Sequence, residues 1–168
     1  MCDLAPTVAP ALAADLDSRS VAAARVIAKV LGYAGVGYET PLARLVEHQD
    51  QQVAREALRS LARIGTAAAA APVVRQIRKV HDDKHAAAED AMWHFPPNQT
   101  MALLRDLLGS RDFVLRHPHT AMRFIDRAGQ GKLVGLEEVL KPYEAFRLRF
   151  WKPSLVQLAR KVKEYRSR

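Results

Sequence analysis

The sequence predicts an all-α protein, folded as a right-handed α-α superhelix (solenoid) of about four helical hairpins with a C-terminal capping helix. Alternating runs of Val, Ile and Thr bounded by turns do not occur, while alanine, leucine and arginine, all strong helix formers, are abundant. Apolar residues recur at helical spacing, as in residues 53–64, and this pattern returns about every thirty residues. Helical units of this size cannot bury their apolar faces alone, so we expect them to stack.

The closing residues of the repeats define the period. Gly35, Gly65, Phe95 with Pro96, and Gly129 follow one another at steps of 30, 30 and 34 residues. Each is expected to end the longer, second helix of a hairpin, and these helices are predicted at 21–34, 53–64, 85–95 and 114–128. Shorter first helices are predicted at 40–48, 72–80 and 100–108, with Pro41 and Pro72 near helix starts. The expected repeats are therefore about 4–35, 36–65, 66–97 and 98–129, in a single domain of residues 1–168.

Residues 50–65 carry a resemblance to a known family. Their sequence, Asp-Gln-Gln-Val-Ala-Arg-Glu-Ala-Leu-Arg-Ser-Leu-Ala-Arg-Ile-Gly, closely resembles the second helix of a HEAT-like (armadillo-type) repeat. Residues 112–116 look like the start of another copy, and Arg25 aligns with Arg55 at a spacing of thirty. The resemblance covers about residues 16–130 and implies an architecture, since HEAT-like arrays serve as scaffolds, binding surfaces and occasionally enzymes. The sequence departs from the family pattern at residues 85–93, which lack the arginine, and at Pro118, which must kink or restart its helix.

The two ends of the expected array differ. Residues 130–168 break the period and are predicted to form the C-terminal cap, with a short helix at 133–140 and a last amphipathic helix opened by Pro153. The apolar stripe of that last helix consists of Leu155, Leu158, Ala159, Val162 and Tyr165. Residues 4–16 are alanine-rich and have no comparable polar helix, so the N-terminal end is a candidate site for homo-oligomer formation or for joining a longer chain.

The charge is concentrated near the C-terminus. The 168 residues carry a formal net charge of +8, which suits an acidic protein, nucleic acid or an anionic membrane as partner. Residues 141–168 hold nine basic and two acidic residues and account for +7 of this charge. Any basic groove on the repeats must therefore be local.

Several classes of protein are disfavoured. Cys2 is the only cysteine, and no apolar stretch approaches the roughly 20 residues that span a bilayer, so we expect a cytoplasmic protein. His81 with His85, and His117 with His119, lack the further ligands that a metal site needs. We predict no metal, no cofactor and no catalytic residue.

The main functional candidate is a row of basic side chains on the second helices. In HEAT-like arrays these helices usually line the concave side, so the resemblance implies a basic groove. A solvated helix face, with Arg55 bonded to neighbouring repeats through residues such as Asp50, explains the same pattern. The residues predicted to bind a partner are Arg25, Lys29, Arg55, Arg59, Arg63, Arg123 and Arg127.

The basic C-terminal cap is a second candidate. Basic residues neutralise phosphates and aromatic rings stack on bases, although the aromatic residues here also suit packing in the core. The secondary candidates are Trp151, Lys152, Arg160 and Lys161.

The sequence thus favours a non-catalytic protein-binding scaffold or adaptor whose partner has an acidic surface. The alternative is a nucleic-acid-binding HEAT-like protein. Some DNA glycosylases built from such repeats use an acidic residue with tryptophans in a basic cleft, and Glu89, Asp90 and Trp93 resemble that set. Packing of Trp93 and Phe95 in the core accounts for the same residues.

Overall fold

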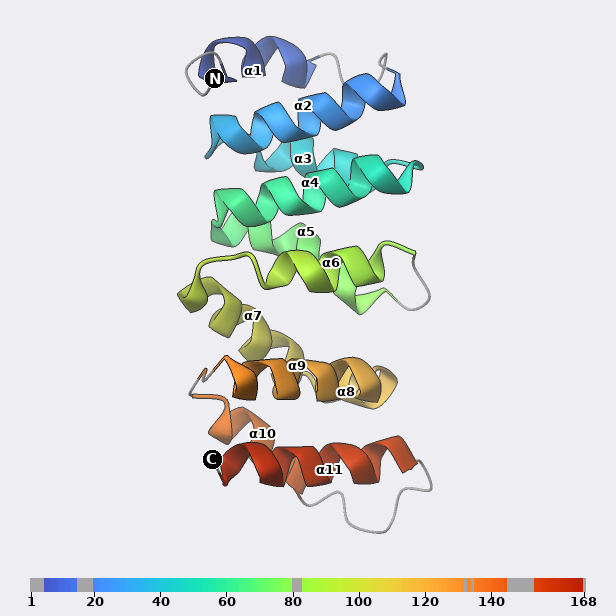
Figure 1. Cartoon of the computed structure of the whole chain (residues 1–168), viewed down its shortest axis with the longest axis vertical. Helices are drawn as coiled ribbons and strands as arrows, with labels where there is room; N and C mark the ends of the chain where they lie inside the picture. Colours follow the sequence, from blue (N-terminus) through green and yellow to red (C-terminus); the bar gives the residue numbers. More distant parts are fainter. Residues whose placement is uncertain are drawn as a thin grey trace. The chain divides into compact units, whose positions relative to one another are not determined.

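The computed structural model describes residues 5–14, 20–79, 83–131, 133, 135–144 and 153–167. Within these ranges it contains eleven α-helices and no strand, so the predicted all-α class is confirmed (Figure 1). The helices belong to two compact units, Met1–Thr100 and Met101–Arg168, which we call the first and the second unit and describe in turn.

The first unit has two layers of helices. Helices α2, α4 and α6 lie side by side, since α2 packs on α4 and α4 packs on α6 (Figure 1). Helices α3 and α5 pack on each other and on α4. The helices are α1 (Ala5–Ala14), α2 (Val21–Ala34), α3 (Glu39–Val46), α4 (Gln51–Ile64), α5 (Ala67–Arg78), α6 (His85–Met92) and the start of α7 (Pro97–Gly109).

The ends of α4 show why this segment is helical. The Asp50 carboxylate accepts hydrogen bonds from the N–H groups of Gln52 and Val53, which the first turn leaves without intrahelical partners. Gly65 ends the helix at φ 71°, in the left-handed region that favours glycine, and its N–H bonds to the Leu61 carbonyl. The predicted end of this helix at Gly65 is therefore confirmed.

Two predicted boundaries in the first unit are wrong. The helix predicted at 72–80 begins earlier, at Ala67, because the Thr66 hydroxyl caps the Ala69 N–H and five alanines follow. Pro72 consequently lies inside α5 and not at its start. The helix predicted at 85–95 ends at Met92, followed by a turn.

The second unit contains most of α7 together with α8 (Arg111–Arg116), α9 (Pro118–Gln130), α10 (Glu137–Glu144) and α11 (Pro153–Arg166). Pro118 restarts the chain as α9, so the helix predicted at 114–128 is divided in two. The helix predicted at 133–140 begins at Glu137, after Gly135 at φ 98°. The apolar stripe of α11 is confirmed through its buried residues Leu155, Leu158, Ala159 and Val162, while Tyr165 is half-buried.

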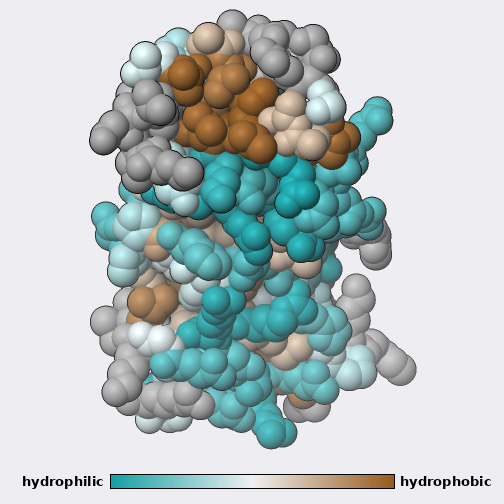
Figure 2. Space-filling model, turned by 45° about the horizontal axis from the view of Figure 1, so that its top comes forward, coloured by the Kyte–Doolittle hydropathy of each residue, from teal (hydrophilic) through white to brown (hydrophobic). Residues whose placement is uncertain are grey.

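The outer side of α1 and α2 is unusually apolar. Hydrophobic residues gather at this end of the first unit (Figure 2), where Val8, Val21, Val26, Tyr33 and Val36 are between 43% and 72% exposed. By contrast, the positions of α4 thirty residues after Val21 and Val26 are the polar Gln51 and Glu56.

The contact between α2 and α4 is close at Gly32. A Cβ atom added to Gly32 would lie 2.5 Å from both Cβ and Oγ of Ser60, and both residues are buried. Only a glycine on α2 therefore permits this spacing of the two helices.

We predict that Gly32→Ala destabilises the protein, although alanine is the better helix former by about 1 kcal/mol. Overpacking against Ser60 should lower the free energy of unfolding by about 1–3 kcal/mol, measured by urea unfolding followed by circular dichroism. Gly109→Ala is the matched control, because its new Cβ would meet only Val139 at an ordinary 3.7 Å. A Ser60→Gly replacement should restore part of the loss, and an unchanged Gly32→Ala variant would contradict the packing described.

A pH-dependent link joins the starts of α3 and α5. Partial burial acts to raise the pKa of Glu39, but hydrogen bonds from the N–H groups of Glu39 and Gly37 and from the Thr66 hydroxyl hold it below its usual 4.5. Because the folded state lowers this pKa, the stabilisation is complete above about pH 4.5 and is lost as the pH falls through the folded value.

We therefore predict that Glu39→Gln lowers the stability at pH 7 and that the difference from the unmodified protein disappears near pH 3. Urea unfolding at several pH values measures this. Glu56→Gln, which removes a carboxylate without a hydrogen bond in the described ranges, is the control and should cost less at pH 7. A difference that persists at pH 3 would show that Glu39 acts through packing.

Candidate functional site

The basic residues predicted on α2 and α4 form one exposed surface. The two helices begin at residues 21 and 51 and pack side by side, so residues thirty apart hold equivalent positions. Steps of four residues advance about 6 Å along a helix, and neighbouring helix axes lie about 8–10 Å apart. We call these side chains the basic surface: Arg25, Lys29, Arg55, Arg59 and Arg63, all exposed.

Helical spacing places the apolar residues of α2 and α4 in the core and these cations in solvent. Ile27 and Leu31 of α2, and Leu58 and Leu61 of α4, are buried toward the rest of the first unit. Residues one position after a buried residue lie about 100° around the helix, which places Arg25 and Arg59 at the edge of the apolar stripe and in solvent.

Arg63 is held by an aromatic ring. Its guanidinium carbon lies 4.2 Å from the centre of the Tyr33 ring, a cation–π contact between α4 and α2. Tyr33 was not among the predicted site residues, yet the sequence carries the signal, because Tyr33 precedes Arg63 by one thirty-residue step.

The other four cations of the basic surface form no ion pair with a described residue. Among the described residues, Arg25, Lys29, Arg55 and Arg59 form neither a hydrogen bond nor an ion pair. The first unit as a whole holds eleven basic and eleven acidic residues, so the positive charge is local. Glu56 is the only carboxylate on α4 itself, and it is half-buried.

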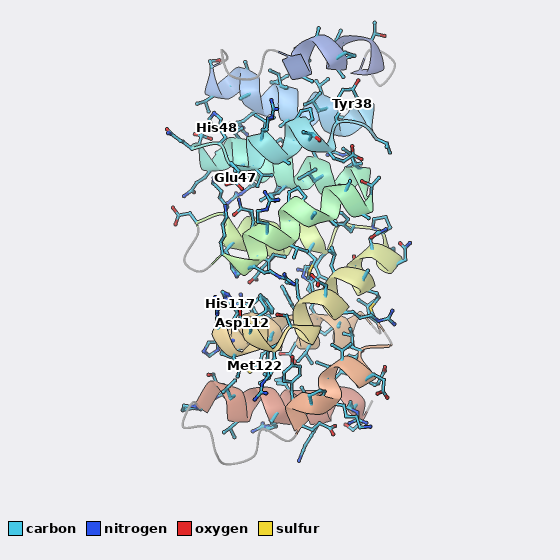
Figure 3. All side chains as sticks on the ribbon, turned by 180° about the vertical axis from the view of Figure 1, so that it is seen from behind. Tyr38, Glu47, His48, Asp112, His117 and Met122 are labelled. Carbon is cyan, nitrogen blue, oxygen red and sulfur yellow. The ribbon has the colours of Figure 1, made fainter. Side chains whose placement is uncertain are left out.

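Several acidic residues of the first unit are engaged elsewhere. Glu39 bonds to Thr66, Asp50 caps α4, and the Glu47 carboxylate pairs with Lys79 Nζ at 2.9 Å at the end of α3 (Figure 3). The bonds of Glu39 and Glu47 connect the ends of α3 and α5, and none of these three carboxylates bonds to a cation of the basic surface.

The basic surface stops at α6. The positions thirty residues after Arg55, Arg59 and Arg63 hold a different set of side chains, namely His85, Glu89 and Trp93. Nε2 of His85 lies 2.7 Å from the Glu89 carboxylate, and these side chains are only 19% and 14% exposed. Glu89 is therefore already engaged within α6, and the following residue in this register, Trp93, is half-buried.

Arg123 and Arg127 lie on α9 in the second unit. Both are exposed and one helical turn apart, and Arg123 donates a hydrogen bond to the Thr120 hydroxyl at 3.1 Å. They form a separate basic pair whose side chains take part in interactions within the protein.

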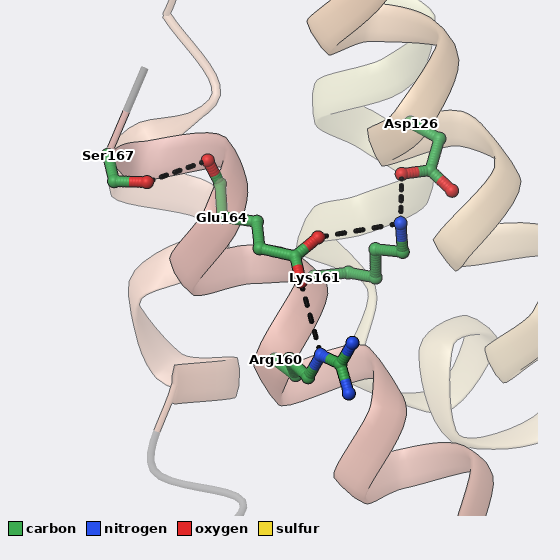
Figure 4. A network of polar contacts seen from close by, with 5 residues as sticks. All are labelled: Asp126, Arg160, Lys161, Glu164 and Ser167. Carbon is green, nitrogen blue, oxygen red and sulfur yellow. Dashed lines mark hydrogen bonds and ion pairs between the residues drawn. The ribbon is translucent and has the colours of Figure 1, made fainter.

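The two described candidates of the basic C-terminal cap, Arg160 and Lys161, form ion pairs. Lys161 Nζ lies 2.9 Å from the Asp126 carboxylate and 3.5 Å from Glu164, and Arg160 pairs with Glu164 at 3.1 Å (Figure 4). The bond to Asp126 raises the pKa of Lys161, and the bond from Arg160 lowers the pKa of Glu164. Trp151 and Lys152 lie outside the described residues.

The described residues meet neither the requirements of a metal site nor those of a membrane-spanning helix. His117 stacks on the Phe113 ring at 5.0 Å between centroids and lies near Asp112 on α8 (Figure 3). In the ranges that the structure describes, no group of three His, Cys, Asp or Glu side chains is arranged to hold a metal ion; His81 lies outside these ranges. None of the helices described has both the length and the apolar character needed to cross a bilayer.

Comparison of the sequence with known protein families and with curated proteins finds no match.

We predict that Lys161 and Asp126 stabilise the second unit as a pair. Lys161→Ala and Asp126→Ala should each lower the melting temperature, and the double variant should lower it by less than the sum of the two, because each single change already breaks the contact. Lys163→Ala, an exposed lysine of α11 without a described partner, is the control and should have little effect. Fully additive losses would show that the two side chains do not interact.

Proposed function

We propose that this protein is a non-catalytic binding scaffold of the HEAT-like type, which binds an acidic protein through the basic surface. The observation that carries the proposal is the set of four exposed cations, Arg25, Lys29, Arg55 and Arg59, on two adjacent helices without a partner in the described ranges. Such cations interact with water in the free protein and are available to carboxylates without first breaking an internal ion pair.

The proposed architecture is a right-handed superhelix of about four hairpins with a C-terminal cap. It is supported by the thirty-residue period, by the two layers of helices in the first unit, and by the family-like segment from Asp50 to Gly65. In HEAT-like arrays the second helices line the concave side, so α2 and α4 would present the basic surface there.

The size of the basic surface favours a protein over nucleic acid as the partner. DNA-binding proteins commonly neutralise about six to ten phosphates, whereas the basic surface offers five cations and ends at the His85–Glu89 pair. Carboxylates one turn apart on a partner helix are spaced by about 6 Å, which matches the spacing of Arg55 and Arg59.

The direct test uses a labelled helical peptide with glutamates one turn apart along one face and polar residues elsewhere. We expect Arg55→Ala/Arg59→Ala to weaken its binding about tenfold, since two solvent-exposed ion pairs are lost. Fluorescence anisotropy at low salt measures the affinity.

The matched control is Arg44→Ala/Arg75→Ala, which removes the same charge from exposed arginines of α3 and α5. It should leave the affinity within about twofold. Equal losses in both variants would refute a specific surface. Tighter binding of duplex DNA than of the peptide, lost in Arg55→Ala/Arg59→Ala, would replace the proposal with the nucleic-acid alternative.

A further inference from the structure

The apolar end of the first unit is more hydrophobic than the fold requires. Val21 and Val26 of α2 are 45% and 62% exposed, while the equivalent positions of α4 are the polar Gln51 and Glu56. Polar residues are therefore compatible with these two positions in α4, whereas α2 has exposed valines there. Contiguous exposed apolar residues of this kind mark interaction sites on soluble proteins.

Equivalent positions of α4 and α2 differ in burial. In α4, Ser60 lies against Gly32 of α2, and both Ser60 and Val53 are fully buried. Their counterparts thirty residues earlier, Ala23 and Val30, are only half-buried. Helix α1 packs on α2, so the apolar residues of α2 that remain exposed are those that α1 and α4 leave accessible within the described ranges.

Charge borders the apolar side chains along one edge. Arg25 precedes Val26 directly and Lys29 follows it by one turn, so both cations flank the exposed valine on α2. Hydrophilic residues of the neighbouring helix lie next to the apolar end in Figure 2. In a partner that covers Val26, the residues beside its apolar stripe would lie next to Arg25 and Lys29.

We propose that the exposed side of α2, with Val8 of α1, binds an amphipathic helix of the partner protein, with an apolar stripe on Val26 and Tyr33, which lie two turns apart on one face, and acidic residues beside Arg25 and Lys29. This inference rests on the proposed function and specifies its partner. A second copy of the chain fits less well, because antiparallel pairing of two α2 helices brings the cations of both copies to the same side of the contact. A lipid surface fits less well because short valine side chains replace the Trp, Phe and Leu typical of membrane-binding helices.

The experiment compares two acidic helical peptides of about 20 residues with the same glutamates, one with a leucine stripe at helical spacing and one with glutamine in place of each leucine. We expect the leucine peptide to bind at least about tenfold more tightly. Val26→Asp should remove this gain. Because its new carboxylate also repels the glutamates of both peptides, the uncharged Val26→Asn is compared with it and should remove the gain while leaving the binding of the glutamine peptide unchanged. Val156→Asp, at a 52% exposed valine of α11, is the control and should preserve the gain.

The outcomes separate this inference from the proposed function. Weaker binding of both peptides to the Arg55→Ala/Arg59→Ala variant tests the basic surface. The higher affinity of the leucine peptide over the glutamine peptide tests the apolar end. Equal affinity of the two peptides, or a gain that survives in Val26→Asp, would overturn the inference. A dimer in sedimentation velocity that Val26→Asp dissociates would assign the surface to a second copy. The protein could instead sediment with vesicles of about seven parts phosphatidylcholine to three parts phosphatidylserine. If Val26→Asp abolished this sedimentation and the two peptides bound equally, the surface would be assigned to the membrane.

Discussion

The approach of α2 to α4 at Gly32 and Ser60 is the contact on which the basic surface depends. Without a side chain on Gly32 the two helices lie close enough for Arg63 to cover the Tyr33 ring and for the cations of both helices to form adjacent rows. The Ser60 side chain is fully buried at this contact, opposite the missing side chain of Gly32.

Basic side chains have two different roles in this protein. In the first unit, Arg55 and Arg59 have no described carboxylate to pair with. In the second unit, Lys161 holds α11 to α9 through Asp126, although it lies in the segment that gives the chain most of its net charge. Charge density along the sequence is therefore a poor guide to the cations that are available for binding.

Local signals in the sequence were sufficient to predict much of the fold. The end of α4 at Gly65 and the apolar stripe of α11 follow from short-range chemistry and periodicity, and both are confirmed. Pro72 predicts a start of α5 that is too late, because the Thr66 cap and the alanines after it begin the helix at Ala67. The position of a helix end depends on which of several local capping bonds forms, and periodicity alone does not decide this.

The candidate site was less predictable, because its character depends on contacts between distant residues. The exposed rows of α2 and α4 follow from helical spacing, but the ion pair of Lys161 joins residues 35 positions apart and has no signature in the sequence. The cation–π contact of Arg63 likewise requires two helices to be neighbours.

The His85–Glu89 pair has a further consequence for selectivity. Because these side chains are bonded to each other and mostly buried, α6 cannot present cations at these positions without giving up a packed contact. The basic surface is thus limited to α2 and α4. Negative charges of a ligand that extend beyond these two helices would meet no further cation of this surface on α6.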